Sequence, residues 1–207
     1  MTEELSKREQ LREERRRQIL EAALTVFGQK GFNGANVSDV AAQAGVSQGT
    51  IYWYFESKEE LLTQALLFFF EGFGQGTLEA LAQCPTAAEK LRALGQAMVG
   101  FATEAEGLFT LFLEFWASSA RRAETGQLWI GMLVEYKDLV VGIIEEGIRN
   151  GEFAPLDAEP LVWAMMAAYD GLAAYDMFLP DLDLGRVSKA FIETLLNGLL
   201  IERQGDD

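Results

Sequence analysis

The side chains best suited to contact a partner gather in one uncharged stretch, VAAQAGVSQGTIYWYF, from Val40 to Phe55. Sixteen residues pass there without a charge, in a chain whose net charge is −15. The amide of Gln48 can pair with an adenine edge in bidentate fashion, and the hydroxyls of Thr50 and the tyrosines suit phosphate oxygens. The chemistry that this stretch offers is therefore recognition of nucleic acid.

The same search finds no set of residues that would catalyse a reaction. Histidine is absent, which removes His-based triads, His-ligated metals and an imidazole switch near neutral pH. No pair of acids stands out in a glycine-rich or strand context. We therefore expect a protein that is not an enzyme and that uses no metal and no cofactor.

Composition indicates a folded, helical protein. The chain has 207 residues, of which 49% are hydrophobic and 24% are charged, and it contains only four prolines. Apolar residues recur at helical spacing, so we predict an all-α fold. The uncharged stretch is shorter than the ~20 residues of a membrane span, the charged N-terminus argues against a signal peptide, and the single Cys84 fits a reducing cytoplasm.

The acidic charge is distributed unevenly. Residues 1–60 carry 8 basic and 10 acidic residues, whereas residues 61–207 carry 9 and 22. The C-terminal bulk would repel a polyanion and the N-terminal third would not. The N-terminal third is therefore the part expected to touch DNA.

Capping residues divide the uncharged stretch and its flanks into short helices. Asn36 can cap a first helix, Gly45 suits a left-handed turn after it, and Ser47 can cap a second helix. Ser57 then begins a third helix with the capping box Ser-Lys-Glu-Glu. Short helices joined by such a tight turn predict a helix-turn-helix.

The second of these helices, from Gln48 to Phe55, is predicted to enter a major groove. Its outward positions are polar or aromatic: Gln48, Gly49, Thr50, Tyr52 and Trp53. Gly49 permits close approach, and Lys58 adds a positive charge at the start of the next helix, where anions are already favoured.

A basic stripe precedes the motif on a long helix predicted from about Leu5 to Gln29. At 100° per residue, one side of this helix collects Arg8, Arg12, Arg15 and Arg16. Two interpretations stay open: a solvated helix whose arginines pair with Glu9, Glu13 and Glu14, or a basic arm along a phosphate backbone.

The segments ILEAALTVFGQKGF and NVSDVAAQAGVSQGTIYWYFESKEELL resemble the TetR family of one-component transcriptional regulators. The resemblance implies a dimer of about nine helices, with the first three binding DNA and the rest holding a ligand and the dimer contact. It places bases near Ser38, Gln48 and Gly49. It places the DNA backbone near the residues Asn36, Val37, Thr50, Tyr52, Trp53, Tyr54 and Lys58. Tyr54 replaces the family's usual histidine, and Glu56 replaces its common lysine.

The remaining chain reads as further helices at about 86–105, 107–119, 124–150, 157–179 and 184–202. We expect a DNA-binding domain at residues 1–56 and a ligand-binding and dimerisation domain at residues 57–207. The last two helices carry stripes that could pair with their twins in a homodimer: Leu161, Ala164, Ala168, Gly171, Leu172 and Tyr175 on the first, and Phe191, Thr194, Leu195 and Gly198 on the second.

The second domain is rich in aromatic and methionine side chains, which could be core or could line an apolar pocket. The pocket interpretation names Phe101, Phe112, Trp116, Trp129, Met132, Leu133, Tyr136, Trp163, Met166, Tyr169 and Asp170. Asp170 lies on a helix that is apolar on nearly every side, so we expect a buried carboxylate with either a structural partner or a ligand contact.

Together these features predict a cytoplasmic, ligand-responsive transcriptional repressor that binds a palindromic operator as a dimer. A small apolar or aromatic effector would release it from double-stranded DNA. Two alternatives remain: a DNA-binding regulator without a physiological effector, and a helical carrier of lipids or small molecules.

Overall fold

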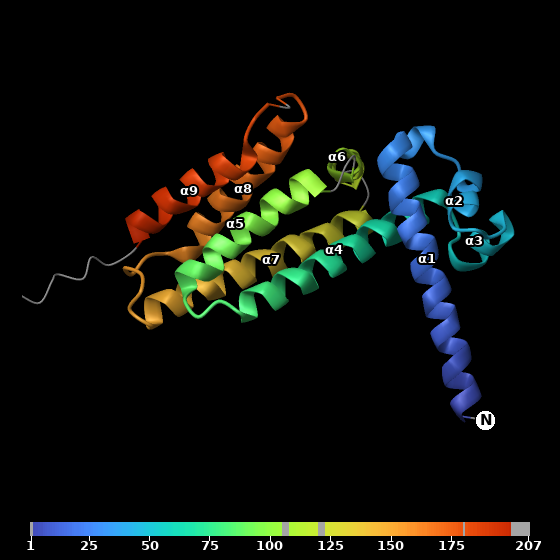
Figure 1. Cartoon of the computed structure of the whole chain (residues 1–207), viewed down its shortest axis with the longest axis horizontal. Coiled ribbons are helices and arrows are strands. Elements are labelled where there is room, and N and C mark those ends of the chain that lie inside the picture. Colours follow the sequence, from blue (N-terminus) through green and yellow to red (C-terminus); the bar gives the residue numbers. More distant parts are fainter. Residues whose placement is uncertain (1, 105–107, 120–122, 180, 200–207) are drawn as a thin grey trace, which may run out of the picture. The chain divides into compact units, whose positions relative to one another are not determined.

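The structure is a computed structural model that describes residues 2–104, 108–119, 123–179 and 181–199. All regular secondary structure in this described part is α-helical, which confirms the predicted fold class. Its nine helices are α1 (Thr2–Gly34), α2 (Val37–Gln43), α3 (Gln48–Tyr54), α4 (Lys58–Ala82), α5 (Ala87–Glu104), α6 (Leu108–Ser119), α7 (Ala123–Arg149), α8 (Ala158–Asp176) and α9 (Leu184–Leu199) (Figure 1).

The helices form two compact units. The N-terminal unit takes Met1–Phe73 and Ala105–Ser118, and the C-terminal unit takes Gly74–Glu104 and Ser119–Asp207. The division falls inside α4, so the compact unit that holds the helix-turn-helix continues beyond residue 56. It includes the first part of α4 and also α6.

The core of the N-terminal unit comes from the apolar sides of α1 to α4. Ile19, Phe27 and Leu61 are fully buried, and Ile51 and Phe55 are 1% and 2% exposed. α1 begins at Thr2, three residues before the predicted start. Its kink lies at Gly31, whose φ of 68° is the left-handed conformation typical of a glycine at a helix end, two residues after the predicted end at Gln29.

The core of the C-terminal unit comes from α5, α7, α8 and α9. α5 packs against α7 and α9, and α7 packs against α8. Leu91, Ile144, Val162 and Leu196 are fully buried at their centre. Each of these four helices thus contributes apolar side chains to one shared core.

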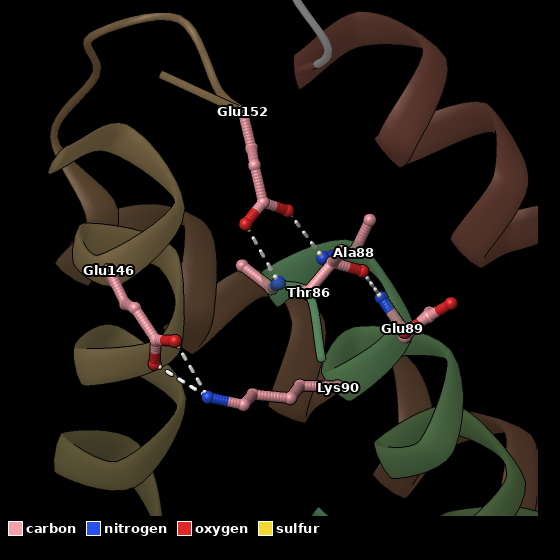
Figure 2. Close-up of polar contacts among 7 residues, drawn as sticks. Thr86, Ala88, Glu89, Lys90, Glu146 and Glu152 are labelled. Carbon is pink, nitrogen blue, oxygen red and sulfur yellow. Dashed lines mark hydrogen bonds and ion pairs between the residues drawn. The ribbon is translucent and has the colours of Figure 1, made fainter. Parts of the chain in front are cut away.

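A carboxylate caps the start of α5 inside the C-terminal unit. Glu152 accepts hydrogen bonds from the backbone N–H groups of Ala87 and Ala88, at 3.2 and 3.3 Å (Figure 2). One turn further on, Lys90 Nζ lies 2.7 Å from both carboxylate oxygens of Glu146 (Figure 2). The end of α7 is thereby tied to the first turn of α5, where free N–H groups favour a negative charge.

Candidate DNA-binding interface and effector region

The turn between α2 and α3 has the geometry that its sequence predicts. Gly45 adopts φ +62°, the left-handed conformation expected there, and the N–H of Val46 donates to the carbonyl of Ala41 at 2.9 Å. Ser47 Oγ then accepts from the N–H of Thr50 at 3.0 Å and caps α3. Ile51 anchors α3 in the core, so the opposite side of this short helix faces outward.

The outward side of α3 carries the polar and aromatic residues proposed to meet DNA. Gln48 and Gly49 are exposed, and Tyr52 and Trp53 are 51% and 65% exposed. Thr50 is half-buried, and its hydroxyl lies 2.8 Å from the hydroxyl of Ser47. The two large aromatic residues thus project from a folded unit without being part of its core.

Residues at the start of α2 divide into exposed and buried positions. Asn36 and Ser38 are exposed, whereas the side chain of Val37 is 6% exposed and packs in the core. The carboxylate of Asp39 accepts from the N–H of Asn36 at 2.9 Å and pairs with Lys30 at 2.9 Å, and these two contacts lower the pKa of Asp39. A contact of Val37 with DNA would therefore use the backbone at the helix start.

Tyr54 and Lys58 have partners within the protein. The Tyr54 hydroxyl donates to the backbone carbonyl of Arg12 at 3.3 Å. Lys58 Nζ donates to the carbonyl of Phe32 and lies 4.4 Å from the centroid of the Phe32 ring. Glu56, the other departure from the family pattern, is exposed and gives its N–H to the carboxylate of Glu60.

The basic stripe of α1 separates into two pairs of arginines. Arg8 and Arg15 are exposed, and Arg15 donates to its neighbour Gln18 at 2.8 Å. Arg12 lies over the ring of Trp53, and Arg16 donates to Gln64 at 2.6 Å. Within the described side chains, none of these arginines forms an ion pair with Glu9, Glu13 or Glu14. The salt-bridged version of the solvated-helix interpretation is therefore not what the structure shows.

The residues proposed for an effector pocket belong to both compact units. Phe112 lies in the N-terminal unit, where its ring is 5.5 Å from that of Phe70 and 5.7 Å from that of Phe109. The others with described side chains lie in the C-terminal unit: Phe101, Trp129, Met132, Leu133, Tyr136, Trp163, Met166, Tyr169 and Asp170. The side chain of Trp116 lies outside the described residues.

Tyr136 on α7 lies near Tyr169 and Asp170 on α8. Burial raises the pKa of the Tyr136 hydroxyl well above its usual value, and Tyr169 and Asp170 add to the rise when they are ionised. The side chain of Asp170 is exposed in the single chain, which corrects the expectation of a buried carboxylate, because α8 turns it out of the core. Its neighbours still remove enough water to raise its pKa.

The structure adds a polar contact that the sequence analysis missed. The hydroxyls of Tyr169 and Ser188 lie 2.9 Å apart, and Ser188 donates to the carbonyl of Gly95 at 3.3 Å. A Cβ at Gly95 would lie 2.7 Å from the Tyr169 hydroxyl, so glycine is required where α5 meets α8 and α9. A single serine in an apolar helix gave no signal from which this contact could be predicted.

Two family models match the chain. The model described as bacterial regulatory proteins of the tetR family matches residues 19–65. The model described as the C-terminal part of BetI-type transcriptional repressors matches residues 87–200, more than half of the chain. The chain belongs to the TetR family. It is therefore a transcriptional regulator, of a family that is not an enzyme family.

Individual relatives agree with this assignment over most of their length. The fatty acid metabolism regulator protein of Bacillus subtilis is 29% identical over 88% of this chain and 94% of its own. FadR of B. subtilis, solved in complex with stearoyl-CoA, is 30% identical with a TM-score of 0.73, covering 87% of this chain and 97% of that one. FadR of Bacillus halodurans, a fatty acid degradation regulator, is 26% identical with a TM-score of 0.77, covering 89% and 95%.

The arginine stripe of α1 lies outside the part of this TetR-family chain that matches the DNA-binding family model. The match begins at Ile19, and all four arginines of the stripe precede that residue.

Within the described residues, no helix is long and apolar enough to cross a membrane. The same residues contain no group of three or more His, Cys, Asp or Glu that could hold a metal ion.

Proposed function

We propose that this TetR-family regulator represses transcription as a homodimer on a palindromic operator in the cytoplasm, and that an apolar effector bound in the C-terminal unit releases it. The observation that carries the proposal is the outward side of α3. Tyr52 and Trp53 are more than half exposed there, beside Gln48, on a helix that Ile51 anchors in the core. Large exposed aromatic side chains at a defined position indicate a surface that meets a partner.

The proposed contacts follow from the placement of the side chains. Ser38, Gln48 and Gly49 would meet base edges, because they are exposed at the starts of α2 and α3. The DNA backbone would be held by Asn36, Val37, Thr50, Tyr52, Trp53 and Lys58. Lys58 can serve although it binds Phe32, since an ammonium group has three donors. We leave Tyr54 out of this set, because the single donor of its hydroxyl is already engaged with the carbonyl of Arg12.

A homodimer would bring two copies of α3 to successive major grooves, about 34 Å apart on one side of B-DNA. We assign its contact to the outward sides of α8 and α9. Ala164 and Ala167 on α8 and Thr194 and Gly198 on α9 are exposed, so the helices of a twin could approach closely. Phe191 and Leu195 lie on the same stripe but are partly buried against the core of their own unit, so only their exposed parts would join this contact.

The effector class that we propose contains a long acyl chain. The C-terminal unit exposes large apolar side chains, among them Trp163, Met177 and Phe178, and the FadR relative at 30% identity was solved with stearoyl-CoA. We therefore propose that this unit binds the acyl chain of such a ligand, because a long hydrocarbon chain is the part that gains from contact with apolar side chains.

Fluorescence anisotropy with labelled duplexes that tile the DNA flanking its own gene tests the DNA-binding part. We expect one duplex to bind more tightly than a scrambled duplex at the same salt concentration. Stearoyl-CoA and stearate should both lower that affinity, and coenzyme A alone should not. Release by coenzyme A alone would contradict the acyl-chain assignment.

Reciprocity provides a second test that also separates the alternatives. An effector that weakens operator binding must itself bind more weakly, by the same factor, when operator DNA saturates the protein. Specific DNA binding without any response to the acyl ligands would favour a regulator without such an effector. Acyl binding without specific DNA binding would favour a carrier of lipids.

A further inference from the structure

The N-terminal extension of α1, residues 7–18, contacts the C-terminal end of α3, which is the proposed recognition helix of the helix-turn-helix. Three consecutive residues of α3 and its C-cap meet it: Trp53, Tyr54 and Phe55. The guanidinium carbon of Arg12 lies 5.0 Å from the Trp53 ring centroid, and that of Arg16 lies 5.9 Å from the Phe55 ring centroid. Both contacts lie within the N-terminal unit, in which α1 continues past α2 and α3 (Figure 1).

Two hydrogen bonds add to these ring contacts. The Tyr54 hydroxyl donates to the carbonyl of Arg12 at 3.3 Å, and Gln18 Nε2 donates to the carbonyl of Ala44 at 2.9 Å. Arg16 also donates to Gln64 at 2.6 Å and thereby ties the extension to α4. The extension is therefore positioned against the helix-turn-helix even though it precedes the residues that the family model matches.

Arg12 differs from Arg16 in how far its side chain is exposed to solvent. Arg16 is half-buried, whereas Arg12 is exposed and lies over a Trp53 ring that is itself 65% exposed. A guanidinium that lies over an aromatic ring contacts the ring through the face of the guanidinium plane. The N–H donors of the guanidinium lie in that plane, so they stay free to bind a phosphate in a bidentate manner. The ring of Tyr54 also meets that of Trp53 edge-on, with the ring centroids 4.7 Å apart.

We propose that Arg12 and Trp53 act as one DNA-contacting pair. Trp53 fixes the plane of the Arg12 guanidinium, and Arg12 donates to a phosphate of the strand that borders the groove entered by α3. This proposal rests on DNA binding through α3. It adds a contact from outside the matched domain, and it requires an arginine at position 12 rather than any positive charge.

A double-mutant cycle with matched charge controls tests the pair. The variants are Arg12→Ala, Arg12→Lys, Trp53→Ala and the double variant Arg12→Ala/Trp53→Ala. Arg17→Ala is the control, because Arg17 lies on the same helix, is exposed and pairs with Glu21 at 3.3 Å. Affinity is measured by anisotropy with the best-binding flanking duplex and a scrambled duplex, over a series of salt concentrations.

We expect Arg12→Ala to weaken binding about tenfold on both duplexes and to lower the salt slope by about 0.9, as for one lost phosphate contact. Arg12→Lys keeps the charge but should still lose about threefold in DNA affinity, because an ammonium group neither stacks on a ring nor binds a phosphate in a bidentate manner. The double variant should bind no more than about twofold more weakly than the weaker single variant, since both remove one unit. Arg17→Ala should stay within about twofold of the wild type.

The free protein gives an independent measurement of the same pair. Acrylamide quenching of Trp53, taken as the difference between each protein and its Trp53→Phe counterpart, should increase in Arg12→Ala and not in Arg17→Ala. Two results would contradict the proposal that Arg12 and Trp53 act as a pair: equal DNA affinities of Arg12→Lys and the wild type, or a loss of affinity in the double variant equal to the product of the two single losses. Neither result would contradict DNA binding through α3. A wild-type protein that binds neither duplex would overturn DNA binding as well.

Discussion

The hydroxyl of Tyr54 donates a hydrogen bond of 3.3 Å to the backbone carbonyl of Arg12, a residue 42 positions earlier in the chain. The recognition helix and the N-terminal extension of α1 are thus joined directly. By its resemblance to the family, Tyr54 stands where a histidine would hold the DNA backbone. In this chain the only donor of the phenol is already engaged with the protein.

Tyr54→Phe tests whether the hydroxyl binds the protein, through the carbonyl of Arg12, or a phosphate of the DNA backbone. We expect the salt slope of DNA binding to stay unchanged, because no phosphate contact is lost. The free energy of unfolding should fall by at most ~1 kcal/mol, the usual net value of a single hydrogen bond. Backbone amides of residues 8–16 should exchange faster in hydrogen-exchange measurements. A salt slope lowered by about 0.9 would instead show that the hydroxyl holds a phosphate.

Gly147 lies where α7 closely approaches Phe153 and Ala87 in the C-terminal unit. A Cβ there would lie 2.3 Å from Phe153 Cδ2 and 2.9 Å from Ala87 Cβ, and Phe153 is 1% exposed. Gly147→Ala should therefore lower the free energy of unfolding by roughly 1–3 kcal/mol, as overpacking of a core does. Gly142→Ala, on the same helix with nothing within 4 Å of the new Cβ, should be neutral or slightly stabilising. Equal midpoints of thermal unfolding for the two variants would contradict this.

Asp170 gives a prediction that depends on pH. Although the side chain is exposed, its neighbours remove part of its water and raise the pKa of its carboxyl above the ordinary value of 3.8, so the folded state disfavours the charged form. Above both pKa values this lowers stability, and below 3.8 the carboxyl is protonated in both states and the effect vanishes. Asp170→Asn should therefore raise the midpoint of thermal unfolding at pH 7, and the gain should fade in acid. A gain that is independent of pH would exclude this cause.

The helix-turn-helix could be predicted because its signals are local. Gly45, Ser47 and Ser57 act within one turn of the chain, and the structure shows the left-handed glycine and both serine caps where the sequence places them. Periodicity predicted the buried side of α1, with Ile19, Ala23 and Phe27, but not that of α8, where Trp163 and the C-cap residue Met177 are exposed. Phe112 shows the limit of such signals, because nothing in its helix indicates that it lies in the N-terminal unit.

Long-range partners explain the remaining differences. The sequence places Arg12 and Arg16 on one side of α1, but their contacts with Trp53 and Gln64 depend on how α3 and α4 pack against that side. The exposed position of Asp170 depends in the same way on how α8 packs in its unit. Residue spacing alone contains neither fact.

The recognition helix should separate sequence reading from general affinity. Gln48→Ala should change the preferred base at one operator position, because its amide can pair with one base edge, at a cost of about 1–3 kcal/mol for the preferred base. Tyr52→Ala should weaken binding to all sequences alike, since a phosphate or sugar contact carries no base preference. Selection from a randomised operator library measures both. An unchanged base preference in Gln48→Ala would exclude its assignment to a base.

The last prediction concerns the part of α4 where the two compact units divide, between Phe73 and Gly74. Gly72, Gly74 and Gly76 follow one another at alternate positions there, and a Cβ at any of them would meet nothing within 4 Å. Packing therefore does not require these glycines, although each weakens a helix by about 1 kcal/mol relative to alanine. Three glycines in five positions would make α4 pliable at one of the points where the chain passes between the two units.

Replacing all three glycines with alanine should stiffen α4 and raise the midpoint of thermal unfolding. If pliability at this point lets the two units respond to one another, the same change should reduce the factor by which stearoyl-CoA weakens operator binding. It should leave the affinity for operator DNA alone within about threefold, because no proposed DNA contact is altered. Gly142→Ala supplies the control, since it adds the same methyl group to a helix with equal room but away from the division. A triple variant with greater stability and an unchanged coupling factor would show that communication does not depend on the glycines of α4.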